Sequence, residues 1–126
     1  MIVVDTSALM AILLNEPSAS DCIRVLRDED LVISAGTVAE ALIVAERRQV
    51  LKEMTRMIEG LGFEVANVTS ADARHVAEAY RVWGKGLHPA GLNFGDCFAY
   101  ALAKARDCAL LYVGDDFSKT DIAGAM

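Results

Sequence analysis

The sequence has little of what would hold a chain together without a hydrophobic core, or anchor it in a membrane. It contains three cysteines, with no CxxC pair, and two prolines among 126 residues. This cysteine usage argues against a disulfide framework and a zinc site, and is typical of reduced thiols in the cytoplasm. No apolar run approaches the roughly 18 residues of a membrane-spanning helix, and the basic segment of a signal peptide is missing before the first apolar run. We therefore expect a cytoplasmic protein without membrane contact.

Positive charge is also scarce. The chain has 12 Lys and Arg against 18 Asp and Glu, a net charge of −6, which argues against nonspecific nucleic-acid binding by the whole surface. The basic residues are nevertheless clustered, and the clusters are Arg47, Arg48, Lys52 and Arg56, then Arg81 and Lys85, then Lys104 and Arg106. The sequence leaves two interpretations open, namely solvated helix faces and a local rim that contacts phosphate groups.

Apolar runs of strand length alternate with segments of helical periodicity along the chain. The expected strands are Ile2–Val4, Leu31–Ser34, Phe63–Ala66 and Leu110–Val113. The expected helices are Ser7–Leu14, Ser18–Arg27, Thr37–Gln49, Leu51–Leu61, Ser70–Val82 and Phe94–Arg106. This order predicts an α/β fold in which a parallel central sheet of four or five strands is flanked by helices on both faces. We expect residues 1–126 to form a single domain.

Five acidic residues occur where such a fold would bring them together. Asp5 follows the first strand run, and Asp115 and Asp116 follow the last one after a glycine. Glu40 and Asp96 lie near the beginnings of two expected helices. Functional groups in parallel α/β sheets gather beyond the carboxyl ends of the strands. We therefore expect these carboxylates at one edge of the sheet.

Each acid also has a local structural explanation. Asp5 can cap the helix that follows it, and the two acids after the last strand run can form an ordinary turn. Thr37-x-x-Glu40 and Asn93-x-x-Asp96 match capping boxes, in which the acid reaches back to the first free amide. The local and functional explanations are compatible, because a helix N-terminus stabilises negative charge and is a suitable mount for a metal-binding carboxylate.

Carboxylates that converge from distant parts of a chain repel one another and cost stability unless a cation neutralises them. Magnesium suits such a group, since it takes oxygen ligands from one or two carboxylates and completes its coordination with water and phosphate oxygens. We expect Asp5 and Asp96 to be direct ligands, with Glu40 and either Asp115 or Asp116 completing the site directly or through water. Such a site supports hydrolysis of phosphodiesters.

Four parts of the chain, taken in order, resemble PIN-domain ribonucleases and, more narrowly, the VapC-type toxins of bacterial toxin–antitoxin pairs. They are Ile2–Leu9 with Asp5-Thr6-Ser7, the central Glu40, Leu92–Cys97 with Asn93-Phe94-Gly95-Asp96, and Leu111–Asp121 with Gly114-Asp115-Asp116. The resemblance covers the whole chain at compatible spacing, and no acid of the set is missing.

The resemblance implies a PIN-like fold and an endoribonuclease that depends on Mg²⁺, or alternatively Mn²⁺, and acts on transfer RNA or another structured RNA. It also implies a homodimer that is silenced in a heteromeric complex with a cognate VapB-like antitoxin. By position, Asp5 and Asp96 match the metal-binding pair of the family, and Glu40 matches its third acid.

The resemblance leaves two assignments open. Relatives differ in which acid of the last pair they retain, so the fourth acid is either Asp115 or Asp116. Either Thr6 or Ser7 matches the hydroxyl position that orients the first aspartate.

Other functions are conceivable from the residues alone. An aspartyl phosphatase would use an aspartate after the first strand as its nucleophile, but it expects a second acid two residues on, where this chain has Ser7. A receiver-like signalling module expects paired acids at the end of the first strand, where only Asp5 is present. A binding protein that keeps an acidic pocket for structure alone is the remaining alternative.

Cysteine, histidine and aromatic residues elsewhere in the chain offer further chemistry. Cys97 could act as a thiol nucleophile with His75 or His88, but no base or oxyanion motif supports this idea. Tyr80 and Trp83 are expected in packing or in an interface. Stacking on RNA bases is the alternative, because both precede a glycine-rich loop.

Overall fold

The computed structural model describes residues 1–126 as four strands and six α-helices, followed by a single 3₁₀ turn. In chain order they are β1 (Ile2–Val4), α1 (Thr6–Leu13), α2 (Ala19–Asp28), β2 (Leu31–Ser34), α3 (Ala35–Arg47), α4 (Leu51–Gly60), β3 (Glu64–Ala66), α5 (Ser70–Trp83), α6 (Phe94–Arg106), β4 (Ala109–Leu111) and the turn η1 (Phe117–Lys119). Each element lies within a residue or two of the segment predicted for it. None of the helices combines the length and apolar character needed to cross a bilayer.

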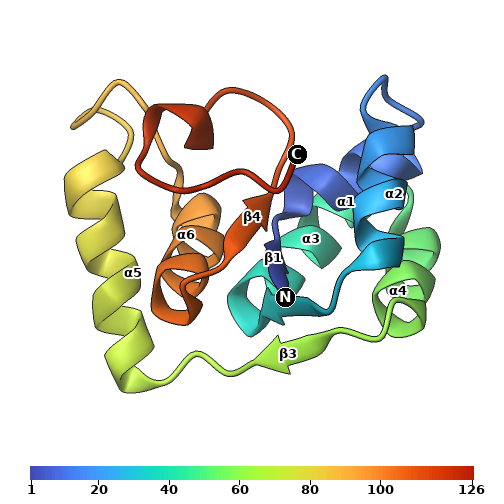
Figure 1. The fold of residues 1–126 in the computed structure, drawn as a ribbon, viewed down its shortest axis with the longest axis horizontal. Coiled ribbons are helices and arrows are strands. Elements are labelled where there is room, and N and C mark those ends of the chain that lie inside the picture. Colours follow the sequence, from blue (N-terminus) through green and yellow to red (C-terminus); the bar gives the residue numbers. More distant parts are fainter.

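The strands form one parallel sheet in the order β3-β2-β1-β4. β1 is central, because Val3 pairs with Val32 of β2 on one side and with Leu110 of β4 on the other. All strands run in the same direction, so their carboxyl ends meet at one edge of the sheet. The predicted α/β fold, a parallel sheet of four strands with helices on both faces, is confirmed (Figure 1).

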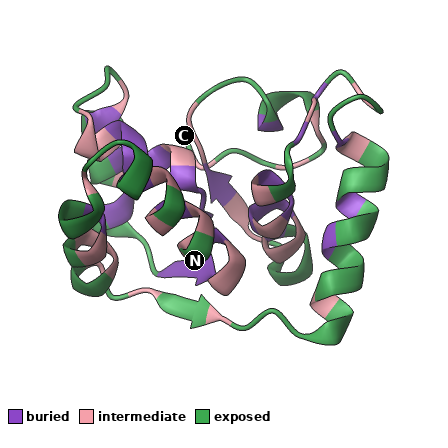
Figure 2. Ribbon diagram, turned by 180° about the vertical axis from the view of Figure 1, so that it is seen from behind, coloured by how far each residue is buried: buried purple, intermediate pink, exposed green.

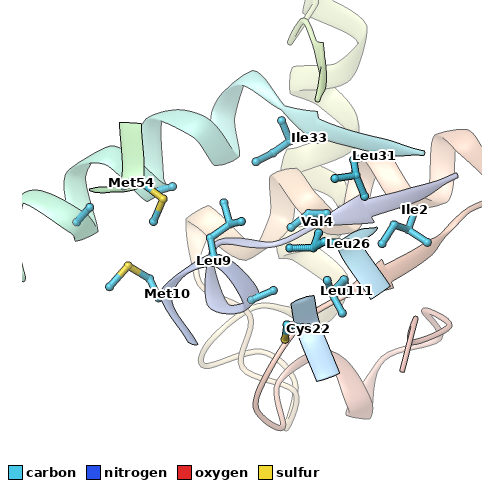
Figure 3. Packing of buried hydrophobic residues seen from close by; sticks show 13 residues of the cluster. Ile2, Val4, Leu9, Met10, Cys22, Leu26, Leu31, Ile33, Met54 and Leu111 are labelled. Atoms are coloured by element: carbon cyan, nitrogen blue, oxygen red, sulfur yellow. The ribbon is translucent and has the colours of Figure 1, made fainter. Parts of the chain in front are cut away.

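Alternate residues of the strands point to opposite faces of the sheet and build two cores. On one face, Ile2 and Val4 pack with α1, α2, α3 and α4 in a cluster of 13 buried residues (Figure 3). On the other face, Val3 packs beneath α5 and α6 in a cluster of 11 buried residues. Because β1 is buried on both faces, Asp5, the residue that follows it, is held in a fixed position relative to both helix layers.

Burial decreases toward the β3 side of the sheet. The three residues of β1 and the four residues of β2 are all buried, whereas β3 lies at the edge and is mostly exposed (Figure 2). α5 also presents much of its surface to solvent (Figure 2). The most tightly packed strands are therefore the two whose carboxyl ends lead directly into α1 and α3.

α3 begins earlier than the sequence predicted. The side chain of Ser34, the last residue of β2, accepts a hydrogen bond from the amide of Gly36 (3.1 Å) and so caps the helix. Thr37 is consequently inside the first turn and fully buried. The capping box predicted for Thr37 and Glu40 is therefore wrong, and Glu40 projects from the body of the helix.

β4 ends earlier than predicted. The predicted strand continues to Val113, but the observed strand stops at Leu111. The reason is that the amide of Val113 donates a hydrogen bond to the hydroxyl of Ser7 (3.0 Å) instead of continuing the strand ladder. The chain thus leaves the sheet beside the residue that follows Asp5 and Thr6.

Candidate active site

Asp5 follows β1 and caps α1, as its position in the sequence predicted. Its Oδ2 accepts hydrogen bonds from the amide (3.0 Å) and the hydroxyl (2.6 Å) of Ser7. Asp5 is only 2% exposed, and its Oδ1 is buried without a hydrogen-bond partner. A buried polar oxygen without a partner costs free energy. Oδ1 is therefore the atom at which a cation or another donor would stabilise the site.

Asp96 occupies the first turn of α6 in the capping box that the sequence predicted. Its Oδ2 accepts a hydrogen bond from the amide of Asn93 (3.0 Å), and its own amide donates to Oδ1 of Asn93 (2.8 Å). The residue is 8% exposed. The cap uses Oδ2 alone, and no protein hydrogen bond holds the other carboxylate oxygen.

Glu40 lies between the neighbours of these two aspartates. The hydroxyl of Thr6, next to Asp5, donates a hydrogen bond to Oε1 of Glu40 (2.7 Å). On the other side the carboxylate lies against the backbone of Gly95, next to Asp96, so closely that a Cβ at position 95 would overlap it. Glu40 is therefore held by contacts from α1 and α6, not by the start of its own helix.

The loop after β4 is tied to Asp5 through Ser7. The Ser7 hydroxyl donates to Asp5 and accepts from the amide of Val113, so one side chain links the two ends of the chain. Gly114 follows with a φ of 107°, a backbone conformation that favours glycine. Ser7 stands where an aspartyl phosphatase would need a second acid. Its hydrogen bonds give it a positioning role instead.

The two acids of this loop differ in their environment. The negative charge of Asp116 contributes to raising the pKa of Asp96. The backbone carbonyl of Asp115 accepts a hydrogen bond from the hydroxyl of Ser118 within the turn. Both side chains are exposed. The structure thus brings Asp116, of the two, into the electrostatic field of the buried acids.

Both buried aspartates bind their protons more tightly than ordinary carboxyl groups do. Burial raises the pKa of Asp5 to about 7, and the charges of Asp96 and Glu40 add to this effect, while hydrogen bonds from Ser7 oppose it. Burial also raises the pKa of Asp96 to about 6, with further contributions from the charges of Glu40 and Asp116. The structure therefore brings four of the five acids singled out in the sequence into one interacting group.

A hard divalent cation suits this group, because all of its donors are carboxylate oxygens and one of them, Oδ1 of Asp5, lacks a partner. No three His, Cys, Asp or Glu side chains converge closely enough to form a complete set of metal ligands. Magnesium tolerates such an open arrangement, since it usually keeps several waters and binds phosphate oxygens of its substrate. Asp5 and Asp96 are the residues that would hold it.

Cys97 is not activated as a nucleophile. Burial and the charge of Asp96 raise the pKa of its thiol to about 12, and the thiol donates a hydrogen bond to the backbone carbonyl of Asn93 (3.4 Å). Because the thiolate is the reactive form of cysteine, the structure gives no support to the thiol alternative.

His88 and Trp83 form hydrogen bonds and an aromatic contact within the fold. Nδ1 of His88 accepts a hydrogen bond from the amide of Ala90 (2.9 Å), and its ring packs edge-on against Trp83. The indole of Trp83 donates a hydrogen bond to the hydroxyl of Tyr100 (2.9 Å). His75 is exposed on α5, and its charge partner is Asp72 of the same helix.

The sequence interpretation did not identify Gly95 as a residue of the site. A glycine in the first turn of a helix disfavours helix formation relative to alanine, and this cost is the signal that could have pointed to it. The close approach of the Glu40 carboxylate explains the glycine. The link between Ser7 and Val113 was also missed, because a hydrogen bond across 106 residues has no local sequence signal.

Comparisons with known proteins agree with this fold. The family model of the PIN domain matches residues 2–123. Ribonuclease VapC30 of Mycobacterium tuberculosis is 39% identical over 125 residues, covering 96% of this chain and 95% of the relative. The crystal structure of M. tuberculosis VapC20, described as a sarcin–ricin loop cleaving toxin, matches with a TM-score of 0.79 at 16% identity over 98% of this chain and 97% of that one.

A toxin–antitoxin complex from Klebsiella pneumoniae contains a second similar chain, with a TM-score of 0.71 at 18% identity over 96% of this chain and 93% of that one. At these identities the two structures establish the likeness of the fold. The family model and the VapC relative extend over nearly the full sequence. This chain belongs to the PIN-domain family and, within it, to the VapC ribonucleases.

Proposed function

We propose that the chain is a metal-dependent endoribonuclease toxin that cuts transfer RNA or another structured RNA, with Asp5, Glu40, Asp96 and Asp116 as its site acids. The observation that carries the proposal is the pair of buried aspartates, Asp5 and Asp96, whose pKa values are raised to about 7 and about 6 at the carboxyl edge of the sheet. Such perturbed groups at a sheet edge are typical of a functional site.

The chain's own residues have distinct roles in this proposal. Asp5 and Asp96 would hold the cation, and its positive charge would favour the ionised form of both carboxyl groups. Ser7 orients Asp5 through two hydrogen bonds, and Thr6 orients Glu40. Glu40 and Asp116 hold water in the site and add negative charge beside Asp96. When bound, Mg²⁺ or Mn²⁺ activates water as a nucleophile and stabilises the leaving oxygen of the phosphodiester.

The partners follow from the family. A VapB-like antitoxin and an RNA substrate are the partners of a VapC toxin, and one of the similar solved structures is a toxin–antitoxin complex. We propose a homodimer of single-domain chains that forms a heteromeric complex with the antitoxin in the cytoplasm. We propose Mg²⁺ as the cation, with Mn²⁺ as the alternative, because both ions take carboxylate and water oxygens as ligands.

RNA cleavage by the purified chain tests the proposal. The wild type should cut a transfer RNA mixture in Mg²⁺ and stop in EDTA, and Asp5→Asn should be inactive in both conditions. Asn also serves as a helix cap, so this variant keeps the start of α1. Asp28→Asn, on the exposed end of α2, is the matched control and should remain active. Equal cleavage by wild type and Asp5→Asn with and without EDTA would refute the mechanism.

A further inference from the structure

A groove of about 410 Å³ lies between α3 and α6, directly beside the acids. Glu40 and Gly95 form its end at the active site, Ile43, Phe94 and Phe98 line it, and Arg47 lies farther along α3. We call it the α3–α6 groove. From Glu40 to Arg47 it follows about two turns of α3, roughly 10 Å. The groove is thus continuous with the site at which a phosphodiester would be cut.

Two large apolar residues of the groove are exposed. Phe94 is 69% exposed and Ile43 is 55% exposed. The Phe94 ring meets the Phe98 ring edge-on, with centroids 5.0 Å apart and planes at 78°. Phe98 in turn lies so close to the backbone of Gly36 that a Cβ there would overlap its ring. Phe94 is therefore supported by a fixed aromatic neighbour and keeps most of its surface open.

A second groove, of about 320 Å³ between α5 and α6, has aromatic and basic residues that are already satisfied. There the Trp83 indole donates to the hydroxyl of Tyr100, and that hydroxyl donates to Asp121 (2.6 Å). Lys104 forms an ion pair with the same aspartate (3.1 Å). Arg47 of the α3–α6 groove, in contrast, takes part in no ion pair. Its charge is available to a ligand.

We propose that the α3–α6 groove binds an unpaired nucleobase beside the phosphate that is cut, stacked on Phe94, while Arg47 contacts a neighbouring phosphate. This inference rests on the RNA cleavage proposed above and adds which part of the RNA is bound. A base is uncharged, so it can lie beside Glu40 without the repulsion that a phosphate would meet. Only a base outside a duplex has a free face for stacking, so the groove selects loops, bulges or single strands.

Binding of a short RNA separates this site from the catalytic acids. The probe is a fluorescein-labelled RNA octamer of mixed sequence, measured by anisotropy in Mg²⁺ with the full chain carrying Asp5→Asn to prevent cleavage. On this background, Phe94→Ala should weaken binding about 5- to 100-fold, the range expected for loss of one stacked base. Phe94→Trp should retain binding. Tyr80→Ala, which removes a partly exposed aromatic ring on α5, is the matched control and should change nothing.

Two further comparisons isolate the base and the phosphate. An abasic octamer with the same backbone should bind equally well with and without Phe94→Ala, because no base is left to stack. Arg47→Ala should reduce the salt dependence of octamer binding, whereas Arg48→Ala, at the adjacent exposed position outside the groove, should not.

Three results would overturn the proposal. The first is equal octamer binding by Phe94→Ala and Tyr80→Ala, or no measurable binding by the Asp5→Asn chain. The second is a change of sedimentation mass with Phe94→Ala, which would assign the groove to contact with a second copy. The third is loss of antitoxin binding by Phe94→Ala while its octamer binding stays unchanged. Wild-type cleavage of transfer RNA is measured alongside, and its absence would refute the proposed function itself.

Discussion

Two helices of this protein begin with the same capping box, yet the aspartates in the two boxes have opposite properties. At α5, the amide of Thr69 donates to Oδ2 of Asp72 (3.0 Å), and the amide of Asp72 donates to the Thr69 hydroxyl (3.2 Å). At α6, Asn93 and Asp96 form the same pair of hydrogen bonds, with the amide of Asn93 at the same 3.0 Å from Oδ2. The local structure of the two helix starts is therefore closely similar.

The surroundings of the two caps are different. Hydrogen bonds from Thr69 lower the pKa of Asp72, whereas burial and the charges of Glu40 and Asp116 raise the pKa of Asp96 to about 6. A capping box thus fixes where a carboxylate points, but not what it can do. Chemistry at α6 depends on burial beside β1 and on acids from elsewhere in the chain. The α5 cap supplies a built-in control for each property of the α6 cap.

The largest effect is expected from removing the charge in each cap. Asp96→Asn should lower RNA cleavage at least about 100-fold, in the range seen when a group that acts in the transition state is removed. Asp72→Asn makes the same change in the same local structure and should leave cleavage unaltered, with only a small loss of stability. Initial rates on transfer RNA, together with thermal unfolding, provide the measurement. Similar losses of activity in both variants would mean that the helix start, not the acid group, matters.

A smaller effect should follow from exchanging the residues that precede the two aspartates. Gly95→Ala would ordinarily favour a helix, but the added Cβ overlaps the Glu40 carboxylate and must displace it. We expect cleavage to fall roughly 10- to 100-fold, as for changes that disturb the support of a metal site, with no loss of helix content. Ala71→Gly in α5 is the reverse exchange and should slightly lower stability at full activity. Titration with Mg²⁺ should show weaker binding for Gly95→Ala only. Unchanged Mg²⁺ affinity and cleavage in Gly95→Ala would exclude a positioning role for Gly95.

The third effect concerns how the free energy of unfolding depends on pH when no metal is bound. The raised pKa of Asp5, about 7, means that the folded state binds this proton more tightly than the unfolded state. The contribution to stability is fully present below the ordinary carboxyl pKa near 4 and is lost as the pH rises through about 7. Asp96 contributes to stability in the same way, and its contribution is lost as the pH rises through about 6. Asp72 and Asp121 have a lowered pKa. Their contribution to stability therefore changes only in more acidic solution, below the ordinary carboxyl pKa.

Asp5→Asn should therefore be more stable than the wild type at pH 8, by at least about 1 kcal/mol, since one pKa unit corresponds to about 1.4 kcal/mol. The difference should shrink as the pH falls to 5. Urea unfolding of both proteins in EDTA at several pH values measures it, and Mg²⁺ should reduce the difference at pH 8. A difference in stability that is independent of pH would contradict the assignment of the raised pKa to Asp5.

Local patterns explain why much of the fold could be predicted. The apolar strand runs and the period of the helices locate every element of the sheet and its two covering layers. The carboxylates of Asp5 and Asp96 were also predictable, because each follows from a strand end or a cap that lies within a few residues of it. At these two positions, a correct local interpretation also points to the site.

Glu40 shows why the rest could not be predicted. Its spacing from Thr37 suggested a cap, but the cap of α3 is formed by Ser34, and Glu40 is held by Thr6 and Gly95. These contacts depend on how α3 crosses α6, and nothing in the local sequence specifies that crossing. The α3–α6 groove has the same origin, because its two walls, residues 36–47 and 93–98, are 46 to 62 residues apart in the chain.

The link from Ser7 to Val113 has a consequence for how the protein is made. The residue that orients Asp5 is itself held by a backbone amide 106 positions later, and β1 obtains its second neighbour only when β4 is added. A chain still emerging from a ribosome therefore cannot complete its acidic group until nearly all of it has been synthesised. For a ribonuclease, this order predicts that the chain lacks a complete acidic site during most of its own translation.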